Sequence, residues 1–337
     1  MNQTTLTAET SDTAVTVISV VIAAYKGEKY IGEQLKSLFS QTMPPDEILI
    51  GDDSPDDATE KAIDAIRAEA PEKIKIHYIR NTRQLGVLMN FSALAEMAKG
   101  DYIFFCDQDD VWLDHKIETL VNALEQNPDC DLAACDSMRV TADLKPLERL
   151  VNQKYVTDSK TLMFRRIWNF SYSFPGHNIV MRNRKTGMLP FPADFNAYHD
   201  LWMLLYCGIQ NRMIYLNQML VLYRIHDSNA SKPLESGYQS KSFARIRELR
   251  QNTWSDLEVT LNNSLKYREL LFARINPSQI PATNLAYVNG LISFYQWRLE
   301  NYKRRSRIVR LFRLLFHIPD YFKYSRGIRS IIRDILF

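Results

Sequence analysis

Short apolar runs alternate with helix-like segments between residues 17 and 106. Four runs predict buried strands: 17–23, 47–50, 74–79 and 102–106. Between them, apolar residues recur at helical spacing and predict helices near 31–39, 58–68 and 87–98. Because alternating strands and helices form parallel pairs through right-handed crossovers, this pattern predicts an α/β fold with a mainly parallel sheet flanked by helices.

The alternation weakens after Asp136, where longer loops separate the apolar segments. A strand at 179–181, a helix near 201–207 and strands within 213–225 are expected there. This part is expected to complete the sheet and to form the second side of a cleft. After Ser231 the pattern becomes helical, and two long helices are predicted at 240–275 and 284–302, separated by the prolines at 277 and 281.

Polar residues gather where the predicted strands end. Tyr25 follows the first strand, Asp52 and Asp53 end the second, and Asp107-Gln108-Asp109-Asp110-Val111-Trp112 follows the fourth. In open parallel sheets, ligands bind beyond the carboxyl ends of the strands. Mg²⁺ and Mn²⁺ prefer oxygen ligands, so the carboxylates at 107–110 indicate a metal and diphosphate site. The alternative is a cap on the next helix, which would need only one carboxylate.

The other polar motifs each have a structural and a functional interpretation. Tyr25 can pack at the strand end or lie flat against a nucleobase. Asp52 and Asp53 can start a turn or accept hydrogen bonds from a pyrimidine or a ribose. The histidines at 177, 199 and 226 more often have local partners than metal ligands. No Gly-x-Gly-x-x-Gly or Walker loop follows the first strand, which excludes a dinucleotide-dependent dehydrogenase.

Cysteine content and apolar run length bear on the cellular compartment. The four cysteines have no metal-type spacing, and buried thiols suit a reducing compartment. The first fifteen residues contain no Lys or Arg, unlike a signal peptide, and predict a flexible tail at 1–15. No apolar run reaches the roughly 18 residues of a membrane-spanning helix. These features predict a cytosolic protein.

The positive charge of the chain is concentrated at its C-terminal end. Residues 301–337 hold ten Lys or Arg against two Asp, although the whole chain has a net charge of only +3. Arginines recur every third residue from 304 to 313 among apolar side chains, and aromatic side chains follow at 316, 321, 322 and 324. This pattern predicts an amphipathic helix on an anionic membrane, or a helix packed on the protein with its Arg face in solvent. Nucleic acid is not expected, because no recognition module accompanies the cluster.

These motifs together resemble the inverting glycosyltransferases of family 2. Within that family they resemble the bacterial rhamnosyltransferase-like group, which carries an Asp-Gln-Asp-Asp-x-Trp signature. The resemblance covers residues 17–231. Besides the signature, the matching pieces are Ala23-Ala24-Tyr25, Glu33-Gln34, Ser37-Leu38-Phe39-Ser40-Gln41-Thr42, Asp52-Asp53, Gly86, Asn90-Phe91, Gly100-Asp101-Tyr102, His199-Asp200 and Tyr223-Arg224-Ile225-His226. The resemblance implies a GT-A fold, in which a Rossmann-like half binds a nucleotide sugar and a second half shapes the acceptor site.

The resemblance also implies a role for each matching residue. Asp200 is expected to be the catalytic base, and Asp109 and His226 the ligands of Mn²⁺ or Mg²⁺, with Asp107 as a further candidate. The expected nucleotide-sugar contacts are Ala24, Tyr25, Asp52, Asp53, Arg83, Gly86, Asp107 and Gln108. The expected acceptor and sugar pocket comprises Trp112, Gly176, His177, His199 and Trp202.

The chain departs from the family pattern at two places. Ser54-Pro55 replaces a common Gly-Ser, so the turn after Asp53 is expected to differ from that of the family, and Leu201 stands where an aromatic residue is frequent.

The expected function is inverting, metal-dependent transfer of a sugar to a lipid-linked surface polysaccharide precursor. The favoured donor is dTDP-L-rhamnose, and the alternative is a UDP-linked hexose or N-acetylhexosamine. A non-catalytic, nucleotide-binding scaffold of polysaccharide assembly is the rival interpretation. A lipid-linked acceptor favours the membrane interpretation of the basic end, and hence a peripheral protein on the cytoplasmic face of the plasma membrane.

The expected organisation follows from the same resemblance, and the oligomeric state stays open. A glycosyltransferase domain is expected at 16–235, with a nucleotide-sugar half at 16–112 and an acceptor half at 113–235. A helical extension is expected at 236–300 and a basic amphipathic segment at 301–337.

Overall fold

The computed structural model describes residues 16–150, 159–169, 174–185, 187–195, 197–227, 229, 243–304, 306–325 and 327–336. The predicted tail at 1–15 and the predicted boundary at 235 lie outside the described residues.

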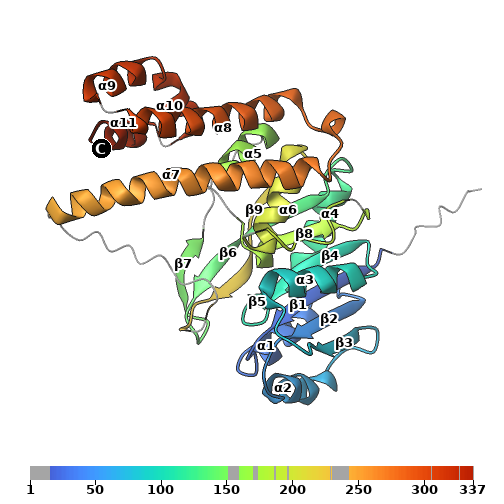
Figure 1. Ribbon diagram of the computed structural model, residues 1–337. Helices are drawn as coiled ribbons and strands as arrows, with labels where there is room; N and C mark the ends of the chain where they lie inside the picture. Colours follow the sequence, from blue (N-terminus) through green and yellow to red (C-terminus); the bar gives the residue numbers. More distant parts are fainter. Residues whose placement is uncertain are drawn as a thin grey trace, which may run out of the picture.

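Four parallel strands form the first half of the sheet, as the sequence predicts (Figure 1). They are β1 (Ile18–Ala24), β2 (Glu47–Asp52), β3 (Lys75–Arg80) and β4 (Tyr102–Asp107), in the spatial order β3-β2-β1-β4. Three helices connect them: α1 (Ile31–Phe39), α2 (Ala58–Arg67) and α3 (Gly86–Met97). In the register of β1, Ala24 lies opposite Asp52 and Ala23 lies opposite Asp107. The polar ends of β1, β2 and β4 therefore lie level at one edge.

The second half makes the sheet mixed. Strand β8 (Ile179–Arg182) pairs antiparallel with β4, and β6 (Leu132–Val140) pairs antiparallel with β8. The long strand β9 (Met213–Arg224) runs parallel to β6, and the short β5 (Val111–Trp112) pairs antiparallel with β9. β7 (Pro146–Leu150) adds to the free end of β6. The β5–β9 pair places the segment after Arg224 beside the 107–112 run.

The second half of the structure excludes one alternative and corrects one expectation. Helix α4 (Lys116–Glu125) begins at Lys116 with His115 at its N-cap position, so neither Asp109 nor Asp110 caps it. The predicted strands within 213–225 are a single strand, β9. Helices α5 (Lys160–Trp168) and α6 (His199–Ile209) complete this half; α5 and strand β6 have no counterpart in the sequence prediction.

The sheet separates two apolar cores because successive side chains of a strand point to opposite faces. Val21 and Phe105 pack on one face with residues of α3 and α6, whereas Val20 and Phe104 pack on the other with residues of α1 and α4. The first core continues into the C-terminal helices. The helical extension is therefore joined to the sheet domain by shared apolar packing.

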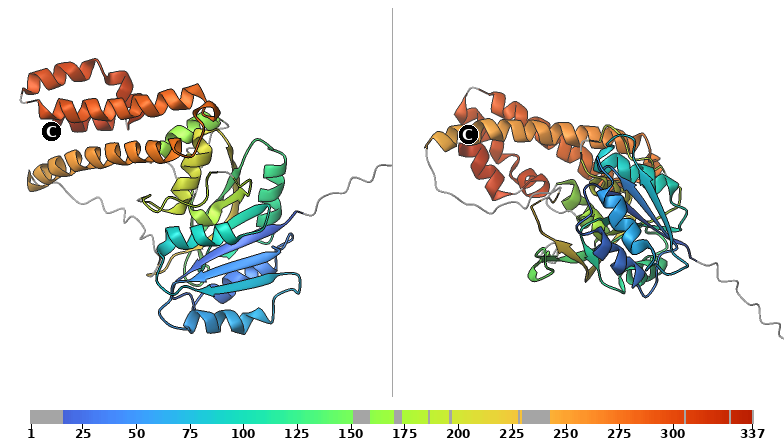
Figure 2. Two further views of the ribbon diagram at one scale, coloured as in Figure 1. Left: turned by 45° about the vertical axis from the view of Figure 1, so that its right-hand side comes forward. Right: turned by 90° about the horizontal axis from the view of Figure 1, so that it is seen from below.

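The predicted helical extension is confirmed and forms one end of the molecule (Figures 1 and 2). Helices α7 (Phe243–Phe272) and α8 (Ala282–Lys303) lie side by side, and α9 (Arg307–Leu315), α10 (Ile318–Tyr324) and α11 (Ile328–Leu336) follow. The basic segment was expected to contain one amphipathic helix and instead contains these last three. Pro319 lies in the first turn of α10, and Gly327, with φ +56°, separates α10 from α11.

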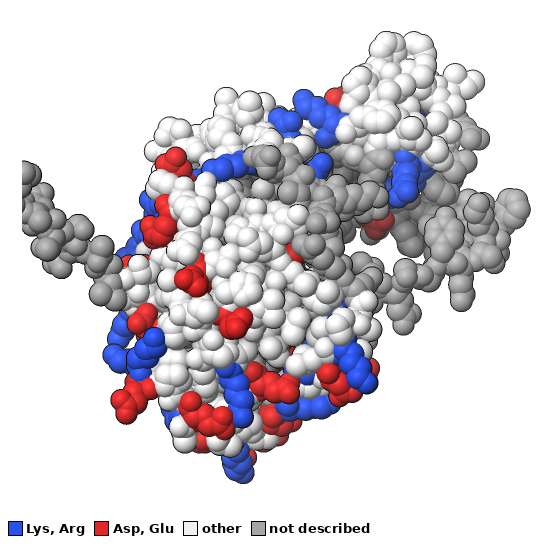
Figure 3. Space-filling model, turned by 180° about the vertical axis from the view of Figure 1, so that it is seen from behind, with Lys and Arg blue, Asp and Glu red and all other residues white. Residues whose placement is uncertain are grey.

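Charge is unevenly distributed over the surface. Acidic and basic side chains intermingle over the sheet domain, whereas the helical end is largely uncharged in the view from behind (Figure 3). Within the described residues, no helix has the length and apolar character needed to span a membrane.

Candidate active site

A cleft of about 410 Å³ opens at the carboxyl ends of β1 and β4. Its walls come from the ends of these strands, the start of α3, the 175–177 turn, the start of α6 and the segment after β9. Many predicted site residues line it: Ala24, Tyr25, Asp53, Gly86, Asp107, Gln108, Asp109, Gly176, His177, His199 and Asp200. A second hollow, of about 500 Å³, shares Tyr25 and Asp53 and also contains Arg83.

Tyr25 and Asp53 form the wall shared by the two hollows. Gln108 holds the backbone of Tyr25 through two 2.9 Å hydrogen bonds, one from Tyr25 N to Oε1 and one from Nε2 to the carbonyl of Tyr25. Tyr25 is 43% exposed and lines both hollows. The Asp53 carboxylate accepts hydrogen bonds from the backbone N–H groups of Leu85 and Gly86 at 3.0 and 2.8 Å. Asp53 therefore shapes the loop before α3.

Five predicted residues do not line this cleft: Arg83 lines the second hollow, His226 contacts Asp109, and Asp52, Trp112 and Trp202 are buried. Asp52 is fully buried, and its carboxylate accepts hydrogen bonds from the Tyr78 hydroxyl at 2.9 Å and from Ser54 N at 2.8 Å. Trp112 is buried beneath the site, and Trp202 is buried in the core with its Nε1 donating to the carbonyl of Met188 at 3.0 Å. Asp53, the residue after Asp52, lines the cleft instead.

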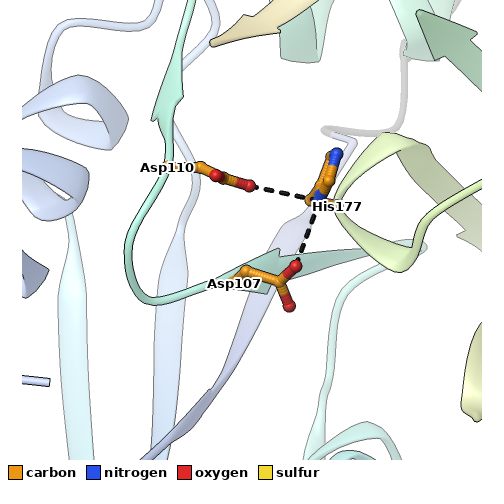
Figure 4. A group of neighbouring side chains, drawn as sticks. All are labelled: Asp107, Asp110 and His177. Atoms are coloured by element: carbon orange, nitrogen blue, oxygen red, sulfur yellow. Dashed lines mark hydrogen bonds and ion pairs between the residues drawn. The ribbon is translucent and has the colours of Figure 1, made fainter. Parts of the chain in front are cut away.

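Two groups of carboxylates and imidazoles occupy the floor of the site. Asp109 Oδ2 lies 2.8 Å from His226 Nε2, so the two predicted metal ligands are neighbours. Asp107 Oδ2 and Asp110 Oδ2 lie 3.0 and 3.1 Å from His177 Nδ1 (Figure 4). Asp107 and Asp109 line the cleft, whereas Asp110 is fully buried behind them.

The buried charges of this floor shift one another's protonation. Burial raises the pKa of Asp110 to about 8, and repulsion by Asp109 and Asp107 adds to the rise. Burial also raises the pKa of Asp109. Burial acts in the same direction on Asp107, but the hydrogen bond and charge of His177 outweigh it and lower the pKa of that carboxyl. The His177 imidazole therefore favours the ionised form of Asp107, whereas burial favours the protonated form of Asp110.

Lys116, which the sequence analysis did not select, supports this floor from behind. Its Nζ donates to the carbonyl of His177 at 2.6 Å and lies 3.1 Å from the centre of the Trp112 ring. Burial lowers the pKa of Lys116 to about 8. A lysine inside an apolar helical stripe is the signal that could have identified it, because burying an ammonium group requires specific partners.

Arg224 and two residues of the 37–42 motif hold the 107–112 run in place. Arg224 N donates to Asp110 Oδ1 at 3.0 Å, and Arg224 Nε donates to the carbonyl of Asp109 at 2.8 Å. Ser37 Oγ accepts from Trp112 N at 3.1 Å, and Gln41 Nε2 donates to the carbonyl of Leu113 at 2.9 Å. The distant motifs found in the sequence therefore act here as clamps on the carboxylate run.

Asp200 and His199 begin helix α6 on the other wall of the cleft. Burial raises the pKa of Asp200 to about 6, and the N–H of Leu201, 2.6 Å from Oδ1, opposes the rise. Burial lowers the pKa of His199 to about 4, which keeps its ring neutral. The ring lies 4.1 Å from that of Phe91, and neither ring nitrogen has a hydrogen-bond partner among the described residues.

The donor atoms at the floor fit a hard divalent cation. Asp109 and His226 present one carboxylate oxygen and one imidazole nitrogen side by side, and Asp107 adds a second cleft-facing carboxylate. Potential ligand atoms of Asp107, Asp110 and His177 also lie within 4.8 Å of one another. Two cleft-facing carboxylates with a single imidazole suit Mn²⁺ or Mg²⁺ better than a thiolate-preferring metal.

Comparisons with known proteins relate the chain to glycosyltransferases. Residues 19–185 match the family described as "Glycosyl transferase family 2". The uncharacterized glycosyltransferase alr2836 of Nostoc sp. is 27% identical over 267 residues, covering 74% of this chain and 81% of that protein. The dTDP-rhamnosyl transferase RfbG of Shigella flexneri is 26% identical over 314 residues, covering 88% of this chain and 100% of that protein. Some other relatives match over 32% to 41% of their own length.

A solved structure confirms the expected GT-A fold. The mannosyltransferase PcManGT from Pyrobaculum calidifontis, in complex with GDP-Man and Mn²⁺, superimposes with a TM-score of 0.52 at 15% identity, covering 96% of this chain and 86% of that chain. At this identity the likeness shows the fold alone.

Proposed function

We propose that this glycosyltransferase, whose residues 19–185 match glycosyl transferase family 2, moves a hexose from a nucleoside diphosphate to a hydroxyl group. The proposed transfer inverts the anomeric configuration. The observation that carries the proposal is the cleft itself. One wall presents Tyr25 and Asp53, the floor presents Asp107 and Asp109, and the other wall presents Asp200. A nucleotide, a diphosphate and an acceptor hydroxyl can occupy these three places together.

Asp200 is the proposed general base of this reaction. Its carboxylate takes the proton of the acceptor hydroxyl while that oxygen bonds to the anomeric carbon. The bond between the anomeric carbon and the diphosphate oxygen breaks, and the electron pair leaves with the nucleoside diphosphate. A pKa of about 6 lets Asp200 be ionised at neutral pH and still accept a proton readily. A single displacement of this kind inverts the anomeric configuration.

Asp109 and His226 are the proposed ligands of a divalent cation, with Asp107 beside them. When bound, the cation supplies positive charge against the diphosphate. The Mn²⁺ and GDP-Man held by PcManGT support this assignment. Neutral His199, with two unpartnered ring nitrogens at the cleft wall, is proposed to hydrogen-bond a sugar or acceptor hydroxyl.

The proposed donor is dTDP-L-rhamnose, and the proposed acceptor is a lipid-linked polysaccharide precursor at the cytoplasmic face of the plasma membrane. The alignment with RfbG over 88% of the chain supports the donor. A UDP-linked hexose or N-acetylhexosamine is the second candidate, because thymine and uracil offer Asp53 the same ring N–H. A non-catalytic scaffold is disfavoured, because Asp107, Asp109 and Asp200 line one cleft and His226 lies 2.8 Å from Asp109.

The test measures nucleoside diphosphate release from a panel of dTDP-, UDP- and GDP-sugars, with membrane extract as the source of acceptor. We expect one donor to be consumed with Mn²⁺ or Mg²⁺ and none with a chelator, and we expect NMR of the product to show the inverted anomer. Asp109→Asn should lower the rate about a hundredfold. The matched control is Asp114→Asn, which changes a carboxylate that is 70% exposed near the same run and should leave the rate unchanged.

Two results would overturn the proposal. Donor binding without turnover of any donor would favour the scaffold. Full activity in the chelator, together with full activity of Asp109→Asn, would remove the metal assignment.

A further inference from the structure

We propose that helices α9, α10 and α11 form a docking face for an anionic lipid membrane. The face consists of exposed apolar side chains on the outside of these three helices: Ile308, Phe312, Leu315, Phe316, Phe322 and Ile328. The inference rests on this surface alone and does not depend on which sugar the cleft transfers.

The exposed apolar residues of α9 follow a helical period. Ile308, Phe312 and Leu315 are spaced as i, i+4 and i+7 and therefore share one side of the helix. They are 81%, 60% and 60% exposed, and the adjacent Phe316 is 71% exposed. The opposite side of α9 already contributes to the core through Leu314, which is 4% exposed. The outer stripe is thus not needed for packing, and contiguous exposed apolar surface of this kind marks an interaction site.

A buried ionic cluster fixes helices α10 and α11 against α8. Arg298 of α8 donates two hydrogen bonds to Asp334 of α11, at 2.8 and 2.7 Å, and both side chains are almost fully buried. The Tyr302 hydroxyl donates to the same carboxylate at 2.8 Å, and Tyr321 of α10 also donates to it. Tyr321 and Tyr324, which the sequence placed with the membrane-facing aromatics, are buried against α8 instead. Helices α10 and α11 are therefore anchored to α8, with Phe322 and Ile328 left outside.

The charges around the face favour an anionic partner. Segment 301–337 holds ten Lys or Arg against two Asp, and both acids already have cationic or imidazole partners. Asp334 is paired with Arg298, and Asp320 lies 2.8 Å from His317. Lys323 and Arg329 are exposed beside the apolar residues. A lipid leaflet with negative headgroups complements both the apolar and the basic character of this surface, whereas a second copy of the face would bring like charges together.

The test is co-sedimentation of the purified full-length protein with vesicles. Binding is expected to vesicles of phosphatidylcholine with about 30% phosphatidylglycerol, and to be weaker with phosphatidylcholine alone. Phe312→Glu with Phe316→Glu should weaken binding roughly tenfold or more, because it places two charges where apolar groups would insert. Lys323→Glu with Arg329→Glu should weaken binding to the anionic vesicles by a similar factor. The matched control is Met97→Glu, a 51% exposed residue at the end of α3, which should bind like the wild type.

Each contrary result has a definite meaning. Absence of wild-type binding, or undiminished binding by the Phe312/Phe316 variant, would overturn the proposal. Sedimentation velocity that shows a dimer split by the same variant, without vesicle binding, would assign the face to self-association. Release of nucleoside diphosphate from soluble donor should be equal in all variants. This readout shows that they are folded and separates failure here from failure of the proposed transferase reaction.

Discussion

The cleft end and the helical end of the molecule differ in what their buried polar groups hold and in which side chains they expose. At the cleft, Asp110, Lys116 and Arg224 are buried, and their hydrogen bonds and ion pairs position groups that face the cleft. At the helical end, the buried ion pair of Arg298 and Asp334 joins helices, while large apolar residues remain outside. Buried polar groups hold the floor of the cleft in place at one end and join helices at the other. Exposed apolar surface at the second end is the feature that indicates a partner.

At the cleft end, removing the proposed base is expected to have the largest effect of the changes considered. Asp200→Asn should lower sugar transfer about 10²- to 10⁴-fold, because an amide cannot accept the hydroxyl proton at neutral pH. Donor affinity measured by calorimetry should remain near that of the wild type. Asp194→Asn, which changes an exposed carboxylate in the loop before α6, serves as the control. Equal activity of Asp200→Asn and wild type would show that the cleft has another base.

Breaking the buried ion pair tests the helical end. Arg298→Met should cost about 3–5 kcal/mol of unfolding free energy, since Asp334 would keep its burial and lose its main counter-charge. Urea unfolding would measure the loss, and hydrogen exchange should show it concentrated in α10 and α11. The exposed Arg329→Met should change stability by less than about 0.5 kcal/mol. If Arg298→Met abolished donor turnover at temperatures where the sheet domain is folded, the two ends would not be separable.

Packing at the cleft wall offers a subtler test. A Cβ atom added at Gly176 would lie 2.2 Å from His199 Nε2, so one of the two groups must move. Gly176→Ala should therefore cost about 1–3 kcal/mol, in stability or in transition-state binding. Comparing kcat/KM with the unfolding midpoint separates the two effects. Gly32→Ala, which meets nothing within 4 Å, is the control. An unchanged Gly176→Ala would show that His199 is free to shift without consequence.

The pH dependence gives the smallest expected change. Below the pKa of Asp200, about 6, an increasing fraction of the base is protonated and inactive. The value of kcat/KM should therefore rise about tenfold per pH unit up to about pH 6 and become constant above it. Burial sets this pKa, Asp107 raises it further, and His177 and the Leu201 N–H lower it. A rate independent of pH between 5 and 7 would contradict the assignment.

Much of the first half of the fold could be predicted because its signals are local. The runs that form β1 to β4 are short and apolar, and Asp107 to Asp110 directly follow one of them. A position at the carboxyl end of a parallel strand then suffices to place a residue at the site. Helix α5 and strand β6 were missed, because they lie where the alternation of strands and helices gives way to longer loops.

The orientation of individual side chains could not be predicted in the same way. Asp52 and Asp53 are adjacent in sequence, yet the first is buried and the second lines the cleft. Asp110 and His177 are far apart in the chain, and the pairing of β8 with β4 and β6 brings them within 3.1 Å. The hydrogen bond from Lys116 Nζ to the carbonyl of His177 depends on the same pairing of β8 with β4 and β6.

The sequence by itself indicated a glycosyltransferase, the edge of the sheet that carries the candidate site and the chemical types gathered there. It also determined that the C-terminal end is basic and amphipathic. Only the tertiary structure decided which carboxylate faces the cleft, which histidine pairs with it and which aromatic residues of the helical end remain outside. The physical reason is the distance along the chain over which each interaction acts. Periodicity and capping act over a few residues, whereas pairing and burial depend on contacts between segments that only folding brings together.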